Sequence, residues 1–215
     1  MRIALVAPLV VAVPPPLYGG TERVISTLAE ELVAQGHEVT LYASGDSHTS
    51  ARLVAGVEEA LWASASSADS QLLHLAELAR VTREAADFDV VHSHLDCLGF
   101  PFGRLAAIPF LHTMHGRMDF PEIASVLAEF PDVRLVSISD SQRRPVPGAH
   151  WIATVYNGLS LRSLPFGEGK GGYVAFLGRI LDLCLECRIL VKVFAAFEAP
   201  EGGNDHTAEC GGYTD

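Results

Sequence analysis

The sequence has few cysteines, few basic residues and no long uncharged apolar run, and each shortage excludes a class of protein. Four cysteines among 215 residues are too few and too unevenly spaced for a disulfide framework, and they are compatible with a reducing compartment. Lys and Arg number 15 against 26 Asp and Glu, so the net charge of −11 argues against duplex nucleic acid as a partner. The most apolar region, 172–197, is interrupted by five charged residues, so no segment is predicted to span a bilayer. The expected location is therefore the cytoplasm.

Apolar residues, by contrast, are abundant enough for a sizeable core. They make up 49% of the chain, and charged residues make up 19%, which is typical of a folded domain. The first 16 residues have one basic residue followed by an apolar run, a pattern that a short secretory signal would share. Pro8 interrupts this run and no clear small-x-small cleavage site follows it, so a buried strand at 3–7 is the favoured interpretation.

Strand-like and helix-like segments alternate along the first 156 residues. The helix predicted at 21–35 has its apolar residues on one face, and Gly36 follows it as a natural stop. Two further helices are predicted at 70–86 and 121–130, and the strands are predicted at 3–7, 38–42, 88–92, 109–113, 133–137 and 151–156. Strands separated by helices imply right-handed crossovers, so the predicted fold is α/β: a Rossmann-like parallel sheet with helices on both faces.

Residues able to bind a ligand follow several of the predicted strands. In parallel sheets of this kind, ligands bind beyond the carboxyl ends of the strands, where the connecting loops meet. We therefore expect one cleft that brings together the following residues: Gly19, Gly20, His94, Asp96, His115, Gly116 and Ser139.

The adjacent glycines Gly19 and Gly20 precede the first predicted helix. A helix N-terminus has unsatisfied N–H groups and a partial positive charge, so a diphosphate can rest against bare backbone there. A plain tight turn would explain the same letters. The segment lacks the G-x-G-x-x-G spacing of a dinucleotide fold, and no acidic residue closes the second strand, which disfavours a nicotinamide or flavin oxidoreductase.

Seven segments then occur in a recognisable order: "MRIALVAP", "PLYGGTERVISTLAEELVAQGHEVTLYASGDS", "DFDVVHSH", "PFLHTMHG", "VSISDSQR", "VYNGL" and "YVAFLGRI". Together they resemble the N-terminal half of a family-4 glycosyltransferase, a retaining enzyme with the two-domain B-type fold. The resemblance covers residues 1–180. It implies hexosyl transfer from a nucleotide-sugar donor to an unknown acceptor, without a metal or another cofactor.

The same resemblance implies roles for individual residues. His115 resembles the family histidine that reaches the transferred sugar, although a surface-loop histidine is the alternative interpretation. Arg179 resembles the arginine that pairs with the donor phosphates, and Asn157 with Gly158 resembles the start of the interdomain hinge. The other donor- or substrate-binding residues that it implies are Gly19, Gly20, Thr21, His94, Gly116 and Ser139.

Two other interpretations of the same side chains are less favoured. His92, His94, His112 and His115 could suggest a metal cluster, but alternate strand positions face opposite sides of a sheet, so the four are not expected to converge. Ser139 and Asp140 with a histidine could suggest a hydrolytic triad, but the chain has no G-x-S-x-G elbow.

The end of the chain departs from the family pattern. We expect residues 1–156 to form the acceptor-side domain, 157–172 a hinge or linker, and 173–215 a poorly ordered remnant of a donor-binding domain. The abrupt change of composition favours a truncation or a frame shift near Ile180, and hence little or no turnover by this chain. A zinc-knuckle-like spacing remains an alternative for the tail, with the ligands Cys184, Cys187, His206 and Cys210.

Three questions stay open at this point. A non-catalytic sugar- or nucleotide-binding α/β module is the alternative to an enzyme. Peripheral contact with a membrane is left open, because members of the family that act on lipid acceptors make such contact. Self-association is also left open, because an uncovered interdomain face would expose apolar surface.

Overall fold

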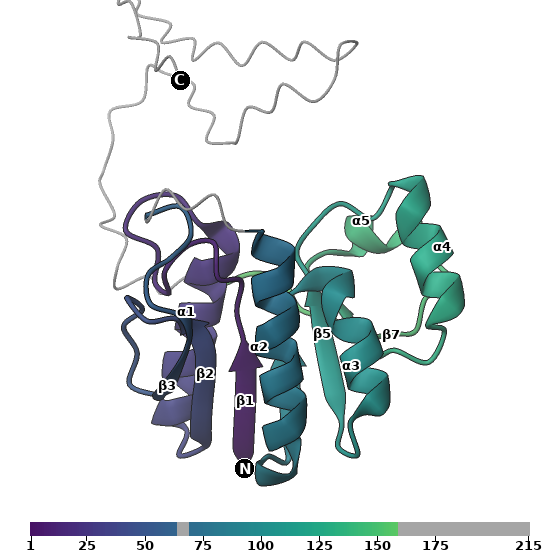
Figure 1. The fold of residues 1–215 in the computed structure, drawn as a ribbon. Coiled ribbons are helices and arrows are strands. Elements are labelled where there is room, and N and C mark those ends of the chain that lie inside the picture. Colours follow the sequence, from purple (N-terminus) through teal and green to yellow (C-terminus); the bar gives the residue numbers. More distant parts are fainter. Residues whose placement is uncertain (64–68, 159–215) are drawn as a thin grey trace, which may run out of the picture. The chain divides into compact units, whose positions relative to one another are not determined.

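The computed structural model describes residues 1–63 and 69–158, which belong to one compact unit, Met1–Leu164. Seven strands form one parallel sheet in the order β3-β2-β1-β4-β5-β6-β7 (Figure 1). Their bounds are Arg2–Val6 (β1), Glu38–Ser44 (β2), Arg52–Val57 (β3), Val90–Ser93 (β4), Phe110–Met114 (β5), Leu135–Ser137 (β6) and Trp151–Thr154 (β7). The predicted Rossmann-like parallel sheet is confirmed.

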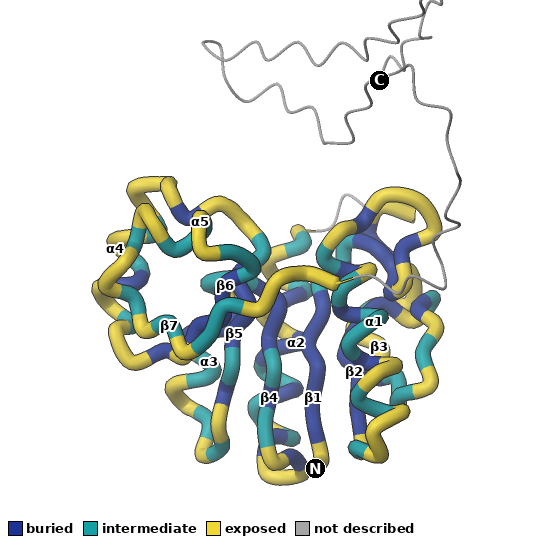
Figure 2. The backbone as a smooth tube through the Cα atoms, turned by 180° about the vertical axis from the view of Figure 1, so that it is seen from behind, coloured by how far each residue is buried: buried dark blue, intermediate teal, exposed yellow. Residues whose placement is uncertain are grey.

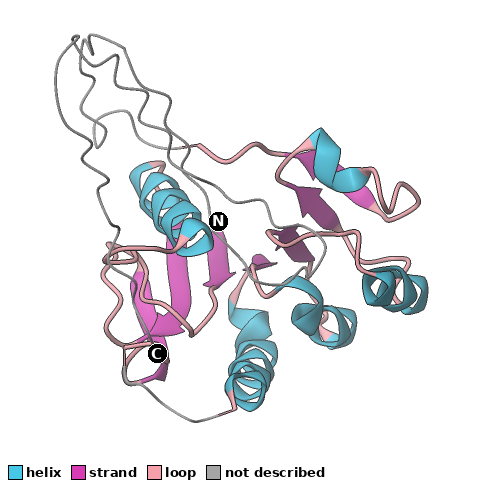
Figure 3. Cartoon of the chain, turned by 90° about the horizontal axis from the view of Figure 1, so that it is seen from above, coloured by secondary structure: helices cyan, strands magenta, loops and turns pink. Residues whose placement is uncertain are grey.

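Helices cover both faces of this sheet, as the sequence predicted (Figure 3). Helix α1 (Gly20–Ala34) lies on one face, and helices α2 (Ser70–Glu84), α3 (Phe100–Leu105) and α4 (Pro121–Glu129) lie on the other. A short helix, α5 (Asp140–Arg143), follows β6, and two 3₁₀ turns lie at Ala85–Asp87 and Asp96–Gly99. Among the described residues, no helix combines the length and the apolar composition that crossing a membrane requires.

The alternation of side chains along β1 explains why the sheet is buried on both faces. Leu5 packs with Ile25 of α1, whereas its neighbour Val6 packs with Leu78 and Val81 of α2. All five side chains have exposed fractions of 0%. Burying each side chain of this size contributes about 1.5–3 kcal/mol, so the centre of the sheet is the main source of stability.

Three elements of the structure were not predicted from the sequence: β3, α3 and α5. β3 is an edge strand with a mostly exposed side-chain pattern, so its letters lack the apolar run of a buried strand. It also contains Gly56, and glycine is a residue that weakens the sequence pattern of a strand. A Cβ at this position would come within 2.9 Å of the Leu9 side chain, which accounts for the glycine. Helices α3 and α5, of 6 and 4 residues, are too short to show a helical period.

Several predictions concern residues 159–215, which lie outside the described residues. They are the role of Arg179, the zinc spacing, the linker beyond residue 158 and the remnant domain at 173–215. These remain predictions.

Candidate active site

Two histidines meet at the carboxyl edge of the sheet. His94 follows β4, and its backbone N–H donates to the carbonyl of Val6 at 2.9 Å, which continues the β4–β1 ladder by one residue. His115 follows β5, and its Nε2 lies 2.8 Å from Nδ1 of His94. The ring of His92 stacks on that of His94 with centroids 4.2 Å apart, and its Nε2 lies 2.7 Å from the Thr113 hydroxyl. Three imidazoles therefore form one cluster on the α1 face.

Asp96 fixes the backbone of this cluster. Its Oδ1 accepts a hydrogen bond from the backbone N–H of His115 at 3.0 Å. Asp96 has a φ of 44°, a left-handed conformation that non-glycine residues seldom adopt. Its Oδ2 would lie 3.5 Å from a Cβ at Gly116, so the two loops that follow β4 and β5 are in close contact. Strained backbone that the surroundings hold in place is typical of functional sites.

Burial keeps these imidazoles neutral. It lowers the pKa of His92 to about 4, with a further contribution from the neighbouring His115. Burial also lowers the pKa of His94 well below its usual value, and His92, His115 and His112 add to the effect. The pKa of His115 is lowered by burial and partly restored by the charge of Asp96. At neutral pH each ring is thus one hydrogen-bond donor and one acceptor.

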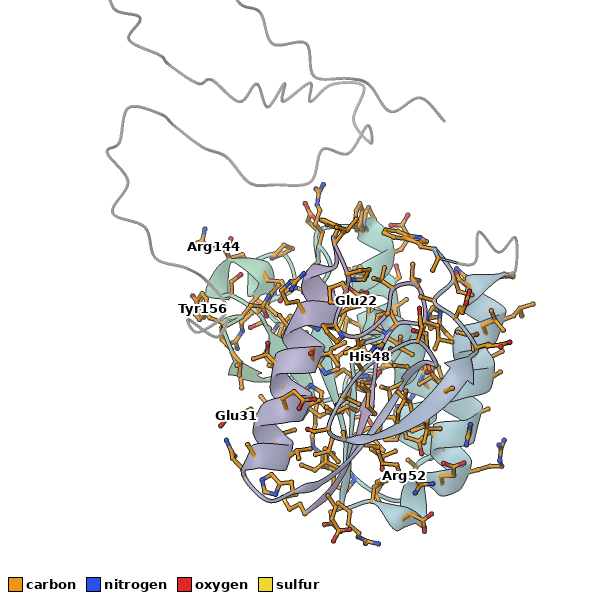
Figure 4. All side chains as sticks on the ribbon, turned by 90° about the vertical axis from the view of Figure 1, so that its left-hand side faces the viewer. Glu22, Glu31, His48, Arg52, Arg144 and Tyr156 are labelled. Carbon is orange, nitrogen blue, oxygen red and sulfur yellow. The ribbon has the colours of Figure 1, made fainter. Side chains whose placement is uncertain are left out.

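Two hollows adjoin this pair of histidines. The first, which we call the α1 groove, has a volume of about 570 Å³ and is lined by Val24, Thr27, Leu28, Glu31, His92, His94, Leu111, Thr113, Val136 and residues 155–158. Figure 2, which looks onto the face that carries α1, shows no described helix in front of β4 and β5, and Figure 4 shows Glu31 and Tyr156 on the same side of the molecule.

The second, which we call the His115 hollow, has a volume of about 430 Å³ and is lined by residues 115–119 with Ile138, Ser139, Ser141, Gln142 and Pro145. His94 lines the first hollow and His115 lines the second. Their hydrogen bond therefore links the two hollows.

Gln142 holds the His115 hollow together. Its Nε2 donates to the carbonyls of Met114 and Gly116, at 2.9 and 2.8 Å, and its Oε1 accepts from the N–H of Ile138 at 2.9 Å. Ser139 lines this hollow as predicted, but its hydroxyl oxygen also caps α5 by accepting from the N–H of Gln142 at 3.1 Å. The importance of Gln142 escaped the sequence analysis because a lone glutamine on a short helix carries no motif.

The two glycines before α1 differ in what they permit. Gly19 has a φ of 154°, and a Cβ there would lie 2.6 Å from Cβ of Pro15 and 2.9 Å from Oε2 of Glu22. Only glycine fits such a position. Gly20 has open space where its Cβ would stand. Gly19 is therefore required by the turn, whereas Gly20 leaves the backbone at the start of the helix uncovered.

Glu22 was not singled out from the sequence, although it lies beside this turn (Figure 4). It stands at the third position of α1, where a glutamate can reach back to the amides of the helix start. The residue is 7% exposed, and burial raises the pKa of its carboxyl. An anion at the start of α1 would meet this carboxyl, so anion binding is expected to favour its protonated form.

The structure brings together the residues that follow β4, β5 and β6. His94, Asp96 and His115 are in contact, and Gly116 and Ser139 line the same hollow as His115. Gly19, Gly20 and Thr21 lie at the start of α1 and line neither hollow, and no described contact joins them to His115. Their place in a common cleft remains a prediction.

The histidines divide between the two faces, as the alternation of strand positions indicated. His112 packs on the α3 face, with its ring 5.0 Å from Phe100 and 5.8 Å from Phe110, measured between centroids. Within residues 1–63 and 69–158, no group of three or more His, Cys, Asp or Glu is placed to hold a metal ion.

Comparison with known proteins identifies the family. The sequence profile of Glycosyltransferase Family 4 matches residues 18–163, which is more than half of the chain. The chain therefore belongs to Glycosyltransferase Family 4. A search of curated proteins found no match.

Several solved structures have a similar course of the chain. The structure of AviGT4, a glycosyltransferase involved in Avilamycin A biosynthesis, is 24% identical, with 72% of this chain and 41% of that chain covered and a TM-score of 0.46. A sucrose-phosphate synthase from Thermosynechococcus elongatus is 14% identical, with 71% and 47% covered and a TM-score of 0.48. A glycosyltransferase from Rickettsia africae ESF-5 is 14% identical, with 71% and 42% covered and a TM-score of 0.47. This chain thus spans less than half the length of these three structures.

Proposed function

We propose that this chain is the acceptor-side part of a retaining hexosyltransferase that uses a nucleotide-sugar donor. Family membership supports glycosyl transfer as the general role. The observation that carries the finer proposal is the bonded pair His94–His115, which lies at the carboxyl edge of the sheet and joins two hollows. Ligands of doubly wound α/β folds bind at this edge.

In this proposal, His115 contacts the transferred sugar from the His115 hollow. The diphosphate of the donor rests at the start of α1, where Gly20 leaves the backbone uncovered. The helix dipole and cationic side chains stabilise the charge that develops on the leaving diphosphate, and the family resemblance implies that Arg179 is one of them. No metal or other cofactor is assigned to the reaction.

The described residues belong to one compact unit. Closing a site against water strengthens the interactions inside it and protects the reactive intermediate, and in two-domain enzymes both domains contribute to that closure. We therefore propose that the described unit by itself binds the donor weakly and turns it over slowly.

Titration calorimetry with UDP-, GDP- and ADP-sugars tests the donor class. Gly20→Ala places a methyl group in the space proposed for the diphosphate, so binding of the preferred donor should weaken about tenfold or more. Gly148→Ala is the matched control, because Gly148 also has open space around its Cβ position but lies before β7 and lines neither hollow. Equal affinities in the two variants, or no binding of any donor by the natural chain, would refute the proposal.

The apolar lining of the α1 groove supports a second candidate, a non-catalytic binding module. The groove is lined by the apolar side chains of Val24, Leu28 and Val136, whereas a diphosphate needs hydrogen-bond donors around it. A transfer assay with radiolabelled donors separates the two candidates. Slow transfer or hydrolysis of a bound donor, above the rate without protein, would favour the transferase. Donor binding with no turnover above that rate would favour the module.

A further inference from the structure

The hydrogen bond between His94 and His115 allows two arrangements of protons. In the first, Nδ1–H of His94 donates to Nε2 of His115, so the proton of His115 is on Nδ1. In the second, Nε2–H of His115 donates to Nδ1 of His94, so the proton of His94 is on Nε2. Each neutral ring has one N–H proton, so the tautomer of one ring fixes the tautomer of the other.

The surroundings of His94 distinguish these arrangements. Its Nε2 is buried and has no hydrogen-bond partner among the described residues, and the residue is 3% exposed. The second arrangement would leave an N–H group at this atom without an acceptor. The first leaves only a lone pair there. Orphaned buried N–H groups are rarer in proteins than under-satisfied acceptors, so the first arrangement is favoured.

We infer that His94 is a positioning residue, whose Nδ1–H holds His115 in the tautomer that carries its proton on Nδ1. The functional consequence of this inference rests on the proposed function, because it concerns the hydrogen bond that His115 makes to a ligand. Nε2 of His115 is occupied by His94, and Nδ1 has no hydrogen-bond partner among the described residues. His115 thus presents a hydrogen-bond donor to an oxygen of the saccharide donor, either a hydroxyl or a phosphoryl oxygen, and does not serve as a base.

The rest of the cluster keeps this arrangement in place. His92 is engaged with the Thr113 hydroxyl and does not compete for Nδ1 of His94. Asp96 accepts a hydrogen bond from the backbone N–H of His115 and so fixes the position of the backbone from which the His115 side chain extends. Burial lowers the pKa of both bonded histidines, so neither ring takes up a second proton near neutral pH.

Long-range ¹H–¹⁵N NMR of the ¹⁵N-labelled full chain at neutral pH tests the inference directly. Protonated and bare ring nitrogens have well-separated ¹⁵N shifts, so each assigned histidine reports its tautomer without any ligand. The expected result is a protonated Nδ1 and a bare Nε2 in His115, with the same pattern in His94. A protonated Nε2 in His115 would overturn the inference.

Two variants show whether His94 is the cause. In His94→Phe an aromatic ring is kept but the hydrogen-bond donor is lost, so nothing holds His115 in one tautomer and its ring ¹⁵N shifts should move toward those of a tautomer mixture. His150→Phe is the control, because His150 is exposed, its Nδ1 lies 3.2 Å from the Asp132 carbonyl, and it lines neither hollow. It should leave the tautomer of His115 unchanged, and a change in this control would overturn the assignment to His94. Circular dichroism checks that both variants fold, and the measurement on the natural chain decides alone if one does not.

Ligand titrations keep this inference separate from the proposed function. If the proposed function holds, His94→Phe should weaken binding of the nucleotide-sugar about fivefold to tenfold, because one hydrogen bond is lost. His150→Phe should change binding less than twofold, a threshold on the order of assay error. If no nucleotide-sugar binds the natural chain, the proposed function fails, whereas the tautomer in the ligand-free spectrum still confirms or refutes the role of His94.

Discussion

The two faces of the sheet use the same residue type in opposite ways. On the α3 face, His112 is 1% exposed, and neither of its ring nitrogens has a partner among the described residues. Its ring packs against Phe100, and a Cβ at Gly99 would come within 2.8 Å of it. On the α1 face, His115 hydrogen-bonds to His94 and lines a hollow. Alternate positions along β5 and just after it face opposite sides of the sheet. His112 therefore packs in the core, whereas His115 lies at the candidate site.

This division extends beyond the histidines. The face under α2, α3 and α4 is filled by apolar side chains, including Leu78, Phe110 and Met114. The opposite face is filled only where α1 covers β1 and β2, and it opens into the α1 groove beside β4, β5 and β6. The filled face is therefore expected to supply most of the stability, and the open half of the other face is where the proposed function places part of its site.

The largest expected effect is on the filled face. Leu78→Ala removes a side chain that is 0% exposed and packs with Val81 and Val6. The free energy of unfolding should fall by about 2–5 kcal/mol, because the remaining side chains cannot close the cavity. Urea unfolding followed by circular dichroism measures this. A loss below about 1 kcal/mol would show that this face is not the main core.

A second effect on the same face depends on pH. Glu77 of α2 is 3% exposed and both of its carboxylate oxygens lack a partner among the described residues, and burial raises the pKa of Glu77 to about 8. The folded state therefore keeps this carboxyl protonated while the unfolded state ionises it above about pH 4.3. The contribution that Glu77 makes to the free energy of unfolding is fully present below that pH and is lost as the pH rises to about 8.

Glu77→Gln keeps the shape of the side chain and removes its titration. The stability of the variant relative to the natural chain should therefore increase by about 3.5 kcal/mol between pH 5 and pH 8. Urea unfolding at pH 5, 6.5 and 8 is the measurement. If both chains depend on pH alike, Glu77 does not titrate as its burial implies.

The sequence was sufficient for every strand of the sheet except β3, and for the edge at which the candidate site lies. The buried strands and α1 have apolar periods, and His94, His115 and Ser139 directly follow strands, so the rule for parallel sheets places them together. Three features of the site could not be predicted. The bond between His94 and His115 depends on ring orientation, the role of Asp96 depends on a left-handed φ, and the bonds of Gln142 join loops distant in sequence.

The smallest expected effect is on the open half-face, and it tests whether that face is open in solution. Leu111 of β5 is half-buried and lines the α1 groove. Leu111→Ala makes the same chemical change as Leu78→Ala, but its side chain is partly in contact with water and no enclosed cavity is created. The loss of unfolding free energy should be about 1 kcal/mol, which is the transfer term for the removed carbons that were buried. A loss as large as that of Leu78→Ala would mean that the groove is filled in solution. Light scattering on the natural chain would then show whether a second copy fills it, because association through an apolar groove raises the measured mass.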